Sequence, residues 1–247
     1  MFRYRNNLMK EILSRNLARA KELICRAAER SGRDPSAITL VAVTKTQGTE
    51  TIKVLGELGH KDIGENRVQE GTEKAVQLAG YNFRYHLIGH LQTNKVKKAL
   101  AMFEIIHSLD SVRLAEAIEK EARVLGRRIK TLIEVNVSGE EAKQGIKPRD
   151  LLSFYQAVEG LRSDRSNIVV AGLMTMTPLI KPGGSAEESR PYFKKMKHLF
   201  EELKTQAPEQ RRAELKYLSM GTSQDYETAV EEGATVLRIG TVLFEGL

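Results

Sequence analysis

The first 32 residues place apolar side chains at steps of three and four along the chain. The positions are Leu8, Ile12, Leu13, Leu17, Ala20, Ile24 and Ala28. A stripe with this spacing covers one side of a helix, so the segment predicts a long amphipathic helix. Gly32 follows the stripe and Pro35 comes soon after, an order typical of a helix C-terminus. We therefore expect a leading helix over residues 1–32.

From Ile38 onward the pattern changes, and short apolar runs rich in β-branched residues alternate with helical stretches. The runs are Ile38–Lys45, Lys61–Asn66, Arg84–His90, Glu104–Asp110, Lys130–Ser138, Ile168–Met176, Lys216–Ser223 and Val236–Phe244. Between them lie stretches with helical spacing, such as Ser111–Gly126 and Arg190–Gln206. Strict alternation of this kind predicts parallel strands that are joined by helical crossovers.

The number of strand–helix units favours a closed barrel. Eight runs, with no glycine-rich nucleotide turn after the first, are typical of a (β/α)8 TIM-type barrel rather than an open doubly wound sheet. We therefore expect an α/β fold with the barrel over residues 38–245, the leading helix as an addition, and one domain over residues 1–247. The segment Lys181–Ser189 is rich in Gly and Ser and predicts a mobile loop after the sixth strand.

The composition narrows the setting and excludes several classes of protein. One cysteine, Cys25, allows no internal disulfide, and a metal cluster is not expected. No apolar run approaches the roughly 20 residues that a membrane span needs. Glu11, Glu22 and Glu29 interrupt the basic N-terminal segment, which argues against a transit peptide. We therefore expect a cytoplasmic protein that spans no membrane.

The formal net charge is +7, which is compatible with an anionic partner. However, the basic residues are interleaved with acidic ones, and RNA-binding signatures and zinc-finger spacings are missing. We expect no nucleic-acid partner. A small ligand that carries phosphate suits the same charge.

Candidate chemistry is expected at the C-terminal ends of the strands, where barrels of this kind place their active sites. Lys45 ends the first apolar run, where burial would lower the pKa of its amine and make it a nucleophile toward an aldehyde. The alternative for Lys45 is a side chain that extends into solvent. For Asp110 and Asn136, the alternative to a site role is capping of the following helices.

The ends of the seventh and eighth runs carry groups suited to phosphate. Ser219–Ser223 and Arg238–Thr241 supply hydroxyls, glycines and backbone N–H groups, in the region where barrels often bind phosphate. A lysine on the first strand opposite such a cradle fits either a sugar phosphate or pyridoxal 5′-phosphate (PLP). Arg238 favours PLP, because the pyridine nitrogen needs a partner and arginine would hold it unprotonated.

At these residues the chain resembles the pyridoxal phosphate homeostasis protein family, which is itself similar to the N-terminal barrel of alanine racemase. The matching segments are Leu40–Lys45, Ile63–Glu70, Tyr85–Lys97, His107–Ser111, Ile133–Ile146, Gly172–Met176, Leu218–Thr235 and Leu237–Thr241. They run in fixed order from the first strand to the last. The set is therefore far more specific than any one of its members.

The resemblance implies a role for each site residue. Lys45 would carry PLP as a Schiff base, Arg238 would face the pyridine nitrogen, and Asn66 would lie near the ring. The residues that would surround the phosphate are Ser219, Gly221, Ser223, Gly240 and Thr241. Met174 and His90 would line the pocket, although His90 suits a hydrogen-bonded core histidine equally well.

The resemblance also implies a function, namely buffering or delivery of PLP without substantial catalysis. PLP-dependent apo-enzymes are the candidate recipients, and a monomer is expected. The main alternative is a slow PLP-dependent amino-acid racemase, and a more distant one is an aldolase-type barrel that acts on sugar phosphates. Alanine racemase takes a second base from a partner subunit through a second domain. This sequence ends at Leu247, directly after the eighth run, so no such domain and no catalytic residues are expected.

Overall fold

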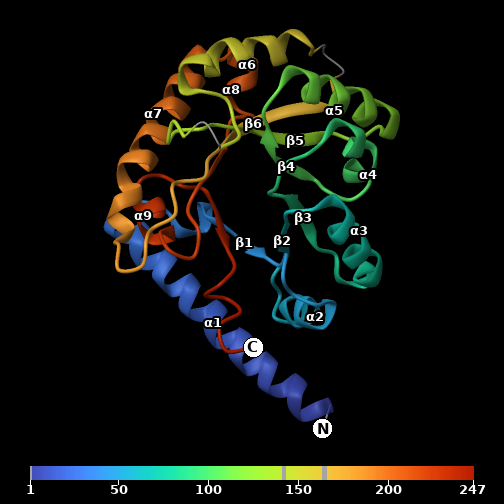
Figure 1. Ribbon diagram of the computed structural model, residues 1–247, viewed down its shortest axis with the longest axis vertical. Helices are drawn as coiled ribbons and strands as arrows, with labels where there is room; N and C mark the ends of the chain where they lie inside the picture. Colours follow the sequence, from blue (N-terminus) through green and yellow to red (C-terminus); the bar gives the residue numbers. More distant parts are fainter. Residues whose placement is uncertain (1, 141–142, 163–165) are drawn as a thin grey trace.

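The computed structural model describes residues 2–140, 143–162 and 166–247, and these form the predicted barrel (Figure 1). Eight parallel strands are hydrogen-bonded in the order β1 to β8, and β1 pairs with β8 to close the sheet. The expected (β/α)8 architecture is therefore confirmed. Of the resemblance segments, Ile133–Ile146 includes residues 141–142, which lie outside the described residues.

The strands are shorter than the apolar runs that predicted them. Their bounds are Thr39–Val43 (β1), Asp62–Glu65 (β2), Arg84–Leu87 (β3), Ile105–Leu109 (β4), Ile129–Glu134 (β5), Ile168–Met174 (β6), Tyr217–Ser219 (β7) and Val236–Ile239 (β8). Each predicted run continued past the strand into polar or glycine residues. Those residues turn away from the ladder, so Lys45, Asn66 and Gly240 lie in loops directly after their strands.

Helices surround the barrel, as the alternation predicted. They are Phe2–Arg30 (α1), Thr49–Glu57 (α2), Val68–Gln77 (α3), Val96–Leu100 (α4), Val112–Leu125 (α5), Leu151–Gly160 (α6), Arg190–Gln206 (α7), Glu209–Arg212 (α8) and Tyr226–Glu231 (α9). Helix α5 shows why the sequence predicted its bounds so closely. The Ser111 side chain caps its start by accepting from Leu114 N, and Gly126 ends it in the left-handed conformation.

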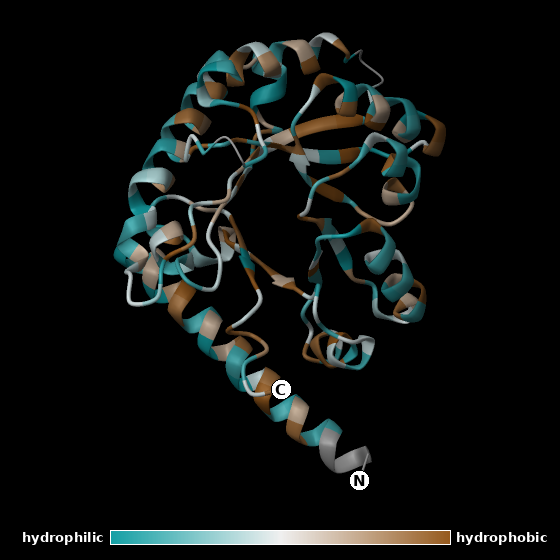
Figure 2. Ribbon diagram, viewed as in Figure 1, coloured by the Kyte–Doolittle hydropathy of each residue, from teal (hydrophilic) through white to brown (hydrophobic). Residues whose placement is uncertain are grey.

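The apolar residues form two clusters. The larger one lies between the outer face of the sheet and the helices. The smaller one fills the barrel interior and consists of Ile105, Leu132, Val169, Ala171 and Met174, with Tyr217 packed against it. In Figure 2 strand β6 is hydrophobic along its length, whereas the surrounding helices mix hydrophilic and hydrophobic positions. The interior of this barrel is therefore packed with side chains at its β4–β6 side.

The leading helix α1 ends at Arg30, close to the predicted end, and lies along α9 and α2. In Figure 1 its N-terminal end extends beyond the barrel, and the C-terminus of the chain lies beside it. Asn16 Nδ2 donates to the carbonyl oxygens of Leu243 (3.1 Å) and Glu245 (2.9 Å). The helix therefore holds the segment that follows β8.

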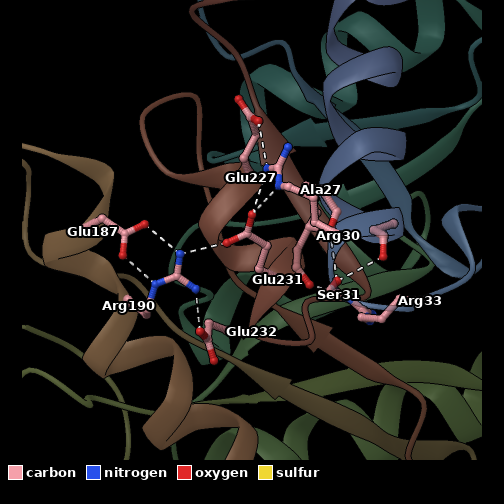
Figure 3. A network of polar contacts seen from close by, with 11 residues as sticks. Ala27, Arg30, Ser31, Arg33, Glu187, Arg190, Glu227, Glu231 and Glu232 are labelled. Atoms are coloured by element: carbon pink, nitrogen blue, oxygen red, sulfur yellow. Dashed lines mark hydrogen bonds and ion pairs between the residues drawn. The ribbon is translucent and has the colours of Figure 1, made fainter.

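Charged side chains join α1 to two other helices (Figure 3). Arg30 Nε donates to Glu231 of α9 at 2.8 Å, and Arg190 at the start of α7 bonds both Glu231 (2.7 Å) and Glu232 (2.6 Å). Arg190 also pairs with Glu187. We call Arg30, Arg190 and their glutamate partners the surface ion network.

The segment Lys181–Ser189, predicted as a mobile loop, contains regular structure, and its mobility stays a prediction. Its second half, Ala186–Ser189, is a 3-10 helix whose start is capped by Ser185 and Glu188 in a capping box. The sequence Ser-x-x-Glu carries this signal, but the neighbouring glycines concealed it. Among the helices of the described ranges, none combines the length and the apolar character that a bilayer crossing would need.

Candidate cofactor-binding site

The predicted site residues gather at one mouth of the barrel. Each lies in the last two residues of its strand or within a few residues after it. Because all strands are parallel and the sheet is closed, these positions share the C-terminal mouth. The fold therefore brings the predicted site residues together, although they are distributed along the sequence from Lys45 to Thr241.

Lys45 lies in the turn that follows β1, and its side chain is exposed. The expected burial of this amine is therefore wrong, because Lys45 lies in a turn that is open to solvent. Its strand is nevertheless the neighbour of β8: a Cβ on Gly240 would lie 3.4 Å from Val43 Cβ. Lys45 therefore stands next to the loop that carries Gly240 and Thr241.

Two backbone N–H groups after β8 converge on one hydroxyl after β7. Ser223 Oγ accepts from Gly240 N (3.2 Å) and from Val242 N (3.4 Å). Thr241 lies between these donors and is exposed. Both bonds are long, and the oxygen of a phosphate dianion is a stronger acceptor for such donors than a hydroxyl. We call Ser223, Gly240 and Val242 the phosphate cradle, a candidate site to which the sequence prediction had not assigned Val242.

Gly221 and a buried aspartate shape the loop that supplies Ser223. Gly221 has a φ of +91°, and a Cβ there would lie 2.5 Å from Ala229 Cβ, so only glycine fits. Asp225 is buried and accepts from Thr222 N (2.7 Å) and from Thr177 Oγ1 (3.1 Å). This loop is therefore tied to the segment after β6, and Thr222 N is already engaged.

Ser219 does not belong to the phosphate cradle. Its hydroxyl is fully buried inside the barrel, where it accepts from Arg238 Nη1 at 2.6 Å and lies 3.0 Å from His107 Nδ1. With both partners in place, the hydroxyl has little capacity left for a ligand. The expected phosphate role of Ser219 is therefore replaced by contact with Arg238.

Arg238 lies on β8 and is buried. Besides Ser219, it donates through Nη2 to Thr175 O (2.7 Å) and contacts Met176 Sδ (3.0 Å). Burial lowers the pKa of Arg238 to about 10, an effect that the charges of Asp225 and Glu134 partly offset. The guanidinium stays charged near neutrality. These contacts use only some of its five N–H donors, so others remain for a ligand atom.

Asn66 carries a buried polar atom without a partner. Its Oδ1 is shielded from solvent and accepts no hydrogen bond within the described residues. Its backbone is pressed against the loop after β3, because a Cβ on Gly89 would lie 2.2 Å from Asn66 O. An unsatisfied buried amide at a barrel mouth is the kind of atom that a bound ligand engages.

The remaining predicted residues have different surroundings. Met174 is buried in the interior cluster, beneath the mouth. His90 is exposed, and its Nδ1 lies 3.2 Å from Asp110 Oδ2. The alternative of helix capping is wrong for Asp110, because Ser111 caps α5. Asn136 instead holds the loop after β5 by donating to Glu140 O at 2.8 Å.

The sequence reasoning missed Glu134, the last residue of β5. Burial and the nearby charge of Asp110 raise its pKa to about 7, an effect that the charge of Arg238 partly offsets. A carboxyl group at the mouth therefore titrates near neutral pH. The signal was an acidic residue inside a predicted strand, within the segment Lys130–Ser138.

Three buried polar residues deeper in the barrel were missed as well, namely Asp62, His86 and His107. They lie within predicted strands, whereas the search for chemistry considered only strand ends. The available signal was a polar residue in an otherwise apolar run, as in the segment around His107.

Comparison with known proteins gives a consistent result. A family model described as alanine racemase, N-terminal domain, matches residues 16–247. The chain is 42% identical over 228 residues to the pyridoxal phosphate homeostasis protein of Aquifex aeolicus, covering 92% of this chain and 95% of that protein.

Solved structures are similar over nearly the whole chain. PipY of Synechococcus elongatus, determined with PLP bound, is 35% identical with a TM-score of 0.76, covering 90% of this chain and 99% of that one. An unknown protein from Bifidobacterium adolescentis is 32% identical with a TM-score of 0.84, and 96% of each chain is covered.

Proposed function

The chain belongs to the pyridoxal phosphate homeostasis protein family, and we propose that it binds PLP at the C-terminal mouth of its barrel. One observation carries the proposal. The neighbouring strands β1 and β8 bring an exposed lysine, a buried arginine and the phosphate cradle to the same mouth. These are the three groups that an aldehyde, a pyridine nitrogen and a phosphate require.

The residues present fit the cofactor. Ser223, Gly240 and Val242 would hold the phosphate, with Thr241 between the two backbone donors. The conformation of Gly221 lets the cradle loop approach closely. In our proposal Lys45 binds the aldehyde carbon, which gives a linkage that borohydride reduces.

The ring would lie between Lys45 and the interior of the barrel. Arg238 would donate an N–H to the pyridine nitrogen, Asn66 would engage a ring oxygen, and Met174 would lie beneath. The unused donors of Arg238 support the contact with the pyridine nitrogen. The unpartnered Oδ1 of Asn66 is an acceptor, so it would accept from the ring hydroxyl in its protonated form. Ser219 supports Arg238 rather than the phosphate.

We propose buffering or delivery of the cofactor rather than catalysis. Bound PLP supplies an electron sink, and that sink is strongest when its pyridine nitrogen is protonated. Arg238 can only donate, so it keeps that nitrogen unprotonated and weakens the sink. The proposal includes action in the cytoplasm as a one-domain monomer, with PLP-dependent apo-enzymes as recipients.

A slow amino-acid racemase is the second candidate, because one observation favours it. Glu134 has a pKa of about 7 at the mouth, so its carboxyl group could exchange a proton near neutral pH. Racemisation needs a base on each face of the substrate. Lys45 and Glu134 are the pair that this candidate requires.

A titration of the protein with PLP and with pyridoxal, followed by visible absorbance, tests the proposal. We expect PLP to bind and pyridoxal, which lacks the phosphate, to bind far more weakly. Ser223→Ala should weaken PLP binding without changing the affinity for pyridoxal. Equal affinity for the two ligands would refute the cradle, and no binding of either would refute the proposed function.

A racemisation assay of the PLP-loaded protein separates the two candidates. Negligible turnover of L-alanine supports the carrier function. Turnover that is lost in Glu134→Gln, while PLP remains bound, would support the racemase instead.

A further inference from the structure

A continuous row of buried polar side chains crosses the barrel interior and ends at Arg238. Arg84 forms a two-bonded ion pair with Asp62 at 2.7 Å, and Asp62 Oδ1 lies 3.0 Å from His86 Nε2. The next contacts are His86 Nδ1 to His107 Nε2 (3.0 Å), His107 Nδ1 to Ser219 Oγ (3.0 Å) and Arg238 Nη1 to Ser219 Oγ (2.6 Å). We call Asp62, His86, His107, Ser219 and Arg238 the interior chain.

The members come from five strands, β2, β3, β4, β7 and β8. His107 and Ser219 are 0% exposed, and Arg238 is 4% exposed. Burying polar groups costs free energy unless each one finds a hydrogen-bond partner. In the interior chain each side chain finds its hydrogen-bond partner in the next one, so no water is needed. Removal of any one side chain would leave its neighbours with unpaired polar groups.

The chemistry of the two ends fixes the direction of every hydrogen bond. A guanidinium only donates, so Ser219 Oγ must accept from Arg238. The hydroxyl then has one proton, and the nitrogen beside it is His107 Nδ1, which must accept. A neutral imidazole that accepts at Nδ1 donates at Nε2, so His107 donates to His86 Nδ1. His86 in turn donates from Nε2 to the carboxylate of Asp62.

The reverse direction leaves a buried proton without an acceptor. If His107 donated from Nδ1, Ser219 Oγ would receive two donors, and its own proton would have no partner among the contacts that the structure gives Ser219. Charge supports the forward direction too. Burial, together with the positive charge of Arg238, holds the pKa of His107 well below its usual range, so this ring is neutral and has one proton to place.

We propose that Ser219, His107, His86 and Asp62 are positioning residues that fix the guanidinium of Arg238 at the cofactor site. The role toward the cofactor rests on the proposed function, whereas the direction of the chain does not. Ser219 Oγ, at the end of β7, and Thr175 O, directly after β6, accept hydrogen bonds from the two terminal nitrogens of the guanidinium. The remaining N–H groups are then pre-oriented for the pyridine nitrogen, and the chain links the buried cation to the negative charge of Asp62.

Long-range nitrogen NMR of the histidine side chains, recorded without PLP, tests the direction. We expect His86 and His107 both to carry their proton on Nε2 and to be unprotonated at Nδ1. A proton on Nδ1 of either ring would overturn the chain as written.

Substitution of Ser219 tests the positioning role. Ser219→Ala removes one hydroxyl and should raise the Kd of PLP about tenfold, the size expected when a hydrogen bond to a charged group is lost. It should also shift the visible absorbance maximum of the bound cofactor, because the donor to its pyridine nitrogen moves. A purely structural serine would not change that maximum.

The matched control is Thr131→Val. Thr131 is also 0% exposed and donates one hydroxyl bond, to Val169 O at 3.1 Å, and no hydrogen bond among the described residues joins its side chain to the interior chain. This variant should leave both the Kd and the absorbance maximum unchanged. Asp62→Asn is the second test variant, because it keeps the acceptor for His86 and removes the charge. It should shift the same maximum by a smaller amount.

The two proposals fail in different ways. If the unsubstituted protein does not bind PLP, the proposed function fails and the NMR measurement alone decides the chain. If it binds PLP, but Ser219→Ala and Thr131→Val have the same Kd and absorbance maximum as the parent, the positioning role is refuted and the proposed function stands.

Discussion

The interior chain and the surface ion network are built from similar groups and differ in what surrounds them. Inside the barrel, each contact joins one donor to one acceptor, as between His107 and Ser219, and solvent is excluded. On the surface, Arg190 bonds three glutamates at once, and its side chain is 25% exposed. Water and salt can replace any one surface contact, whereas nothing can replace a contact in the interior.

The surroundings of a polar residue therefore indicate whether it serves structure or function. The surface ion network joins α1, α9 and α7 and tolerates rearrangement, which suits a structural connection. The interior chain has one arrangement of protons and ends at the residue proposed to face the cofactor. Substitutions in the two regions should therefore lower the free energy of unfolding by different amounts, and the losses should depend differently on salt.

The largest effect should follow His107→Ala. The change opens a cavity inside the barrel and leaves the Ser219 hydroxyl and His86 Nδ1 without partners. We expect the free energy of unfolding to fall by about 3 kcal/mol. Urea denaturation measures it, and the loss should not depend on salt. A loss below that of a surface variant would remove the distinction between the two regions.

At the mouth of the barrel, the raised pKa of Glu134 should make the free energy of unfolding depend on pH. Its pKa is about 7 in the folded protein against 4.5 as the ordinary value, so the folded state binds the proton more tightly. Stability is then present at low pH and is lost as the pH rises through that window, by about 3 kcal/mol. Glu134→Gln should remove this loss, as measured by urea denaturation at several pH values. A parallel pH profile in both proteins would show that Glu134 keeps an ordinary pKa.

A smaller effect is expected in the surface ion network. Arg190→Ala removes contacts with Glu187, Glu231 and Glu232 and should cost about 1 kcal/mol at low ionic strength. High salt should shrink this cost, because it screens exposed charges. The same urea titrations with and without added salt measure it. A cost that is independent of salt would mean that Arg190 acts as a buried group.

The smallest effect should come from Lys10, whose Nζ lies 2.9 Å from Glu57 Oε2 between α1 and α2. Both side chains are nearly half exposed. Lys10→Ala should change the free energy of unfolding by less than about 0.5 kcal/mol. A larger loss would show that this pair, rather than the apolar face of α1, attaches the helix.

The sequence predicted the fold well because the fold depends on periodicity. The spacing of Leu13, Leu17 and Ile24 marks α1, and the alternation of runs marks the barrel. Strand ends were less predictable. The apolar runs continue directly into the polar residues of the site, with no sequence signal at the strand end. The backbone hydrogen bonds show that β1 ends at Val43, and the structure shows that Lys45 is exposed.

The candidate site was predictable in part. Strand-end residues such as Arg238 and Gly240 were found by their type and place, and they do meet at one mouth. The partner of a buried hydroxyl cannot be read from sequence. Ser219 lies four residues before Ser223, yet its oxygen points into the barrel toward His107, which is 112 residues away in sequence.

Borohydride reduction of the PLP-loaded protein, with mass mapping of the modified peptide, tests whether the cofactor binds at this mouth of the barrel. We expect one adduct, on Lys45, which disappears in Lys45→Ala while the fold is retained. Lys61→Ala is the matched control, because Lys61 is also exposed but precedes its strand at the opposite mouth of the barrel. An adduct on another lysine, or one that persists in Lys45→Ala, would contradict the assignment of the cofactor to this mouth.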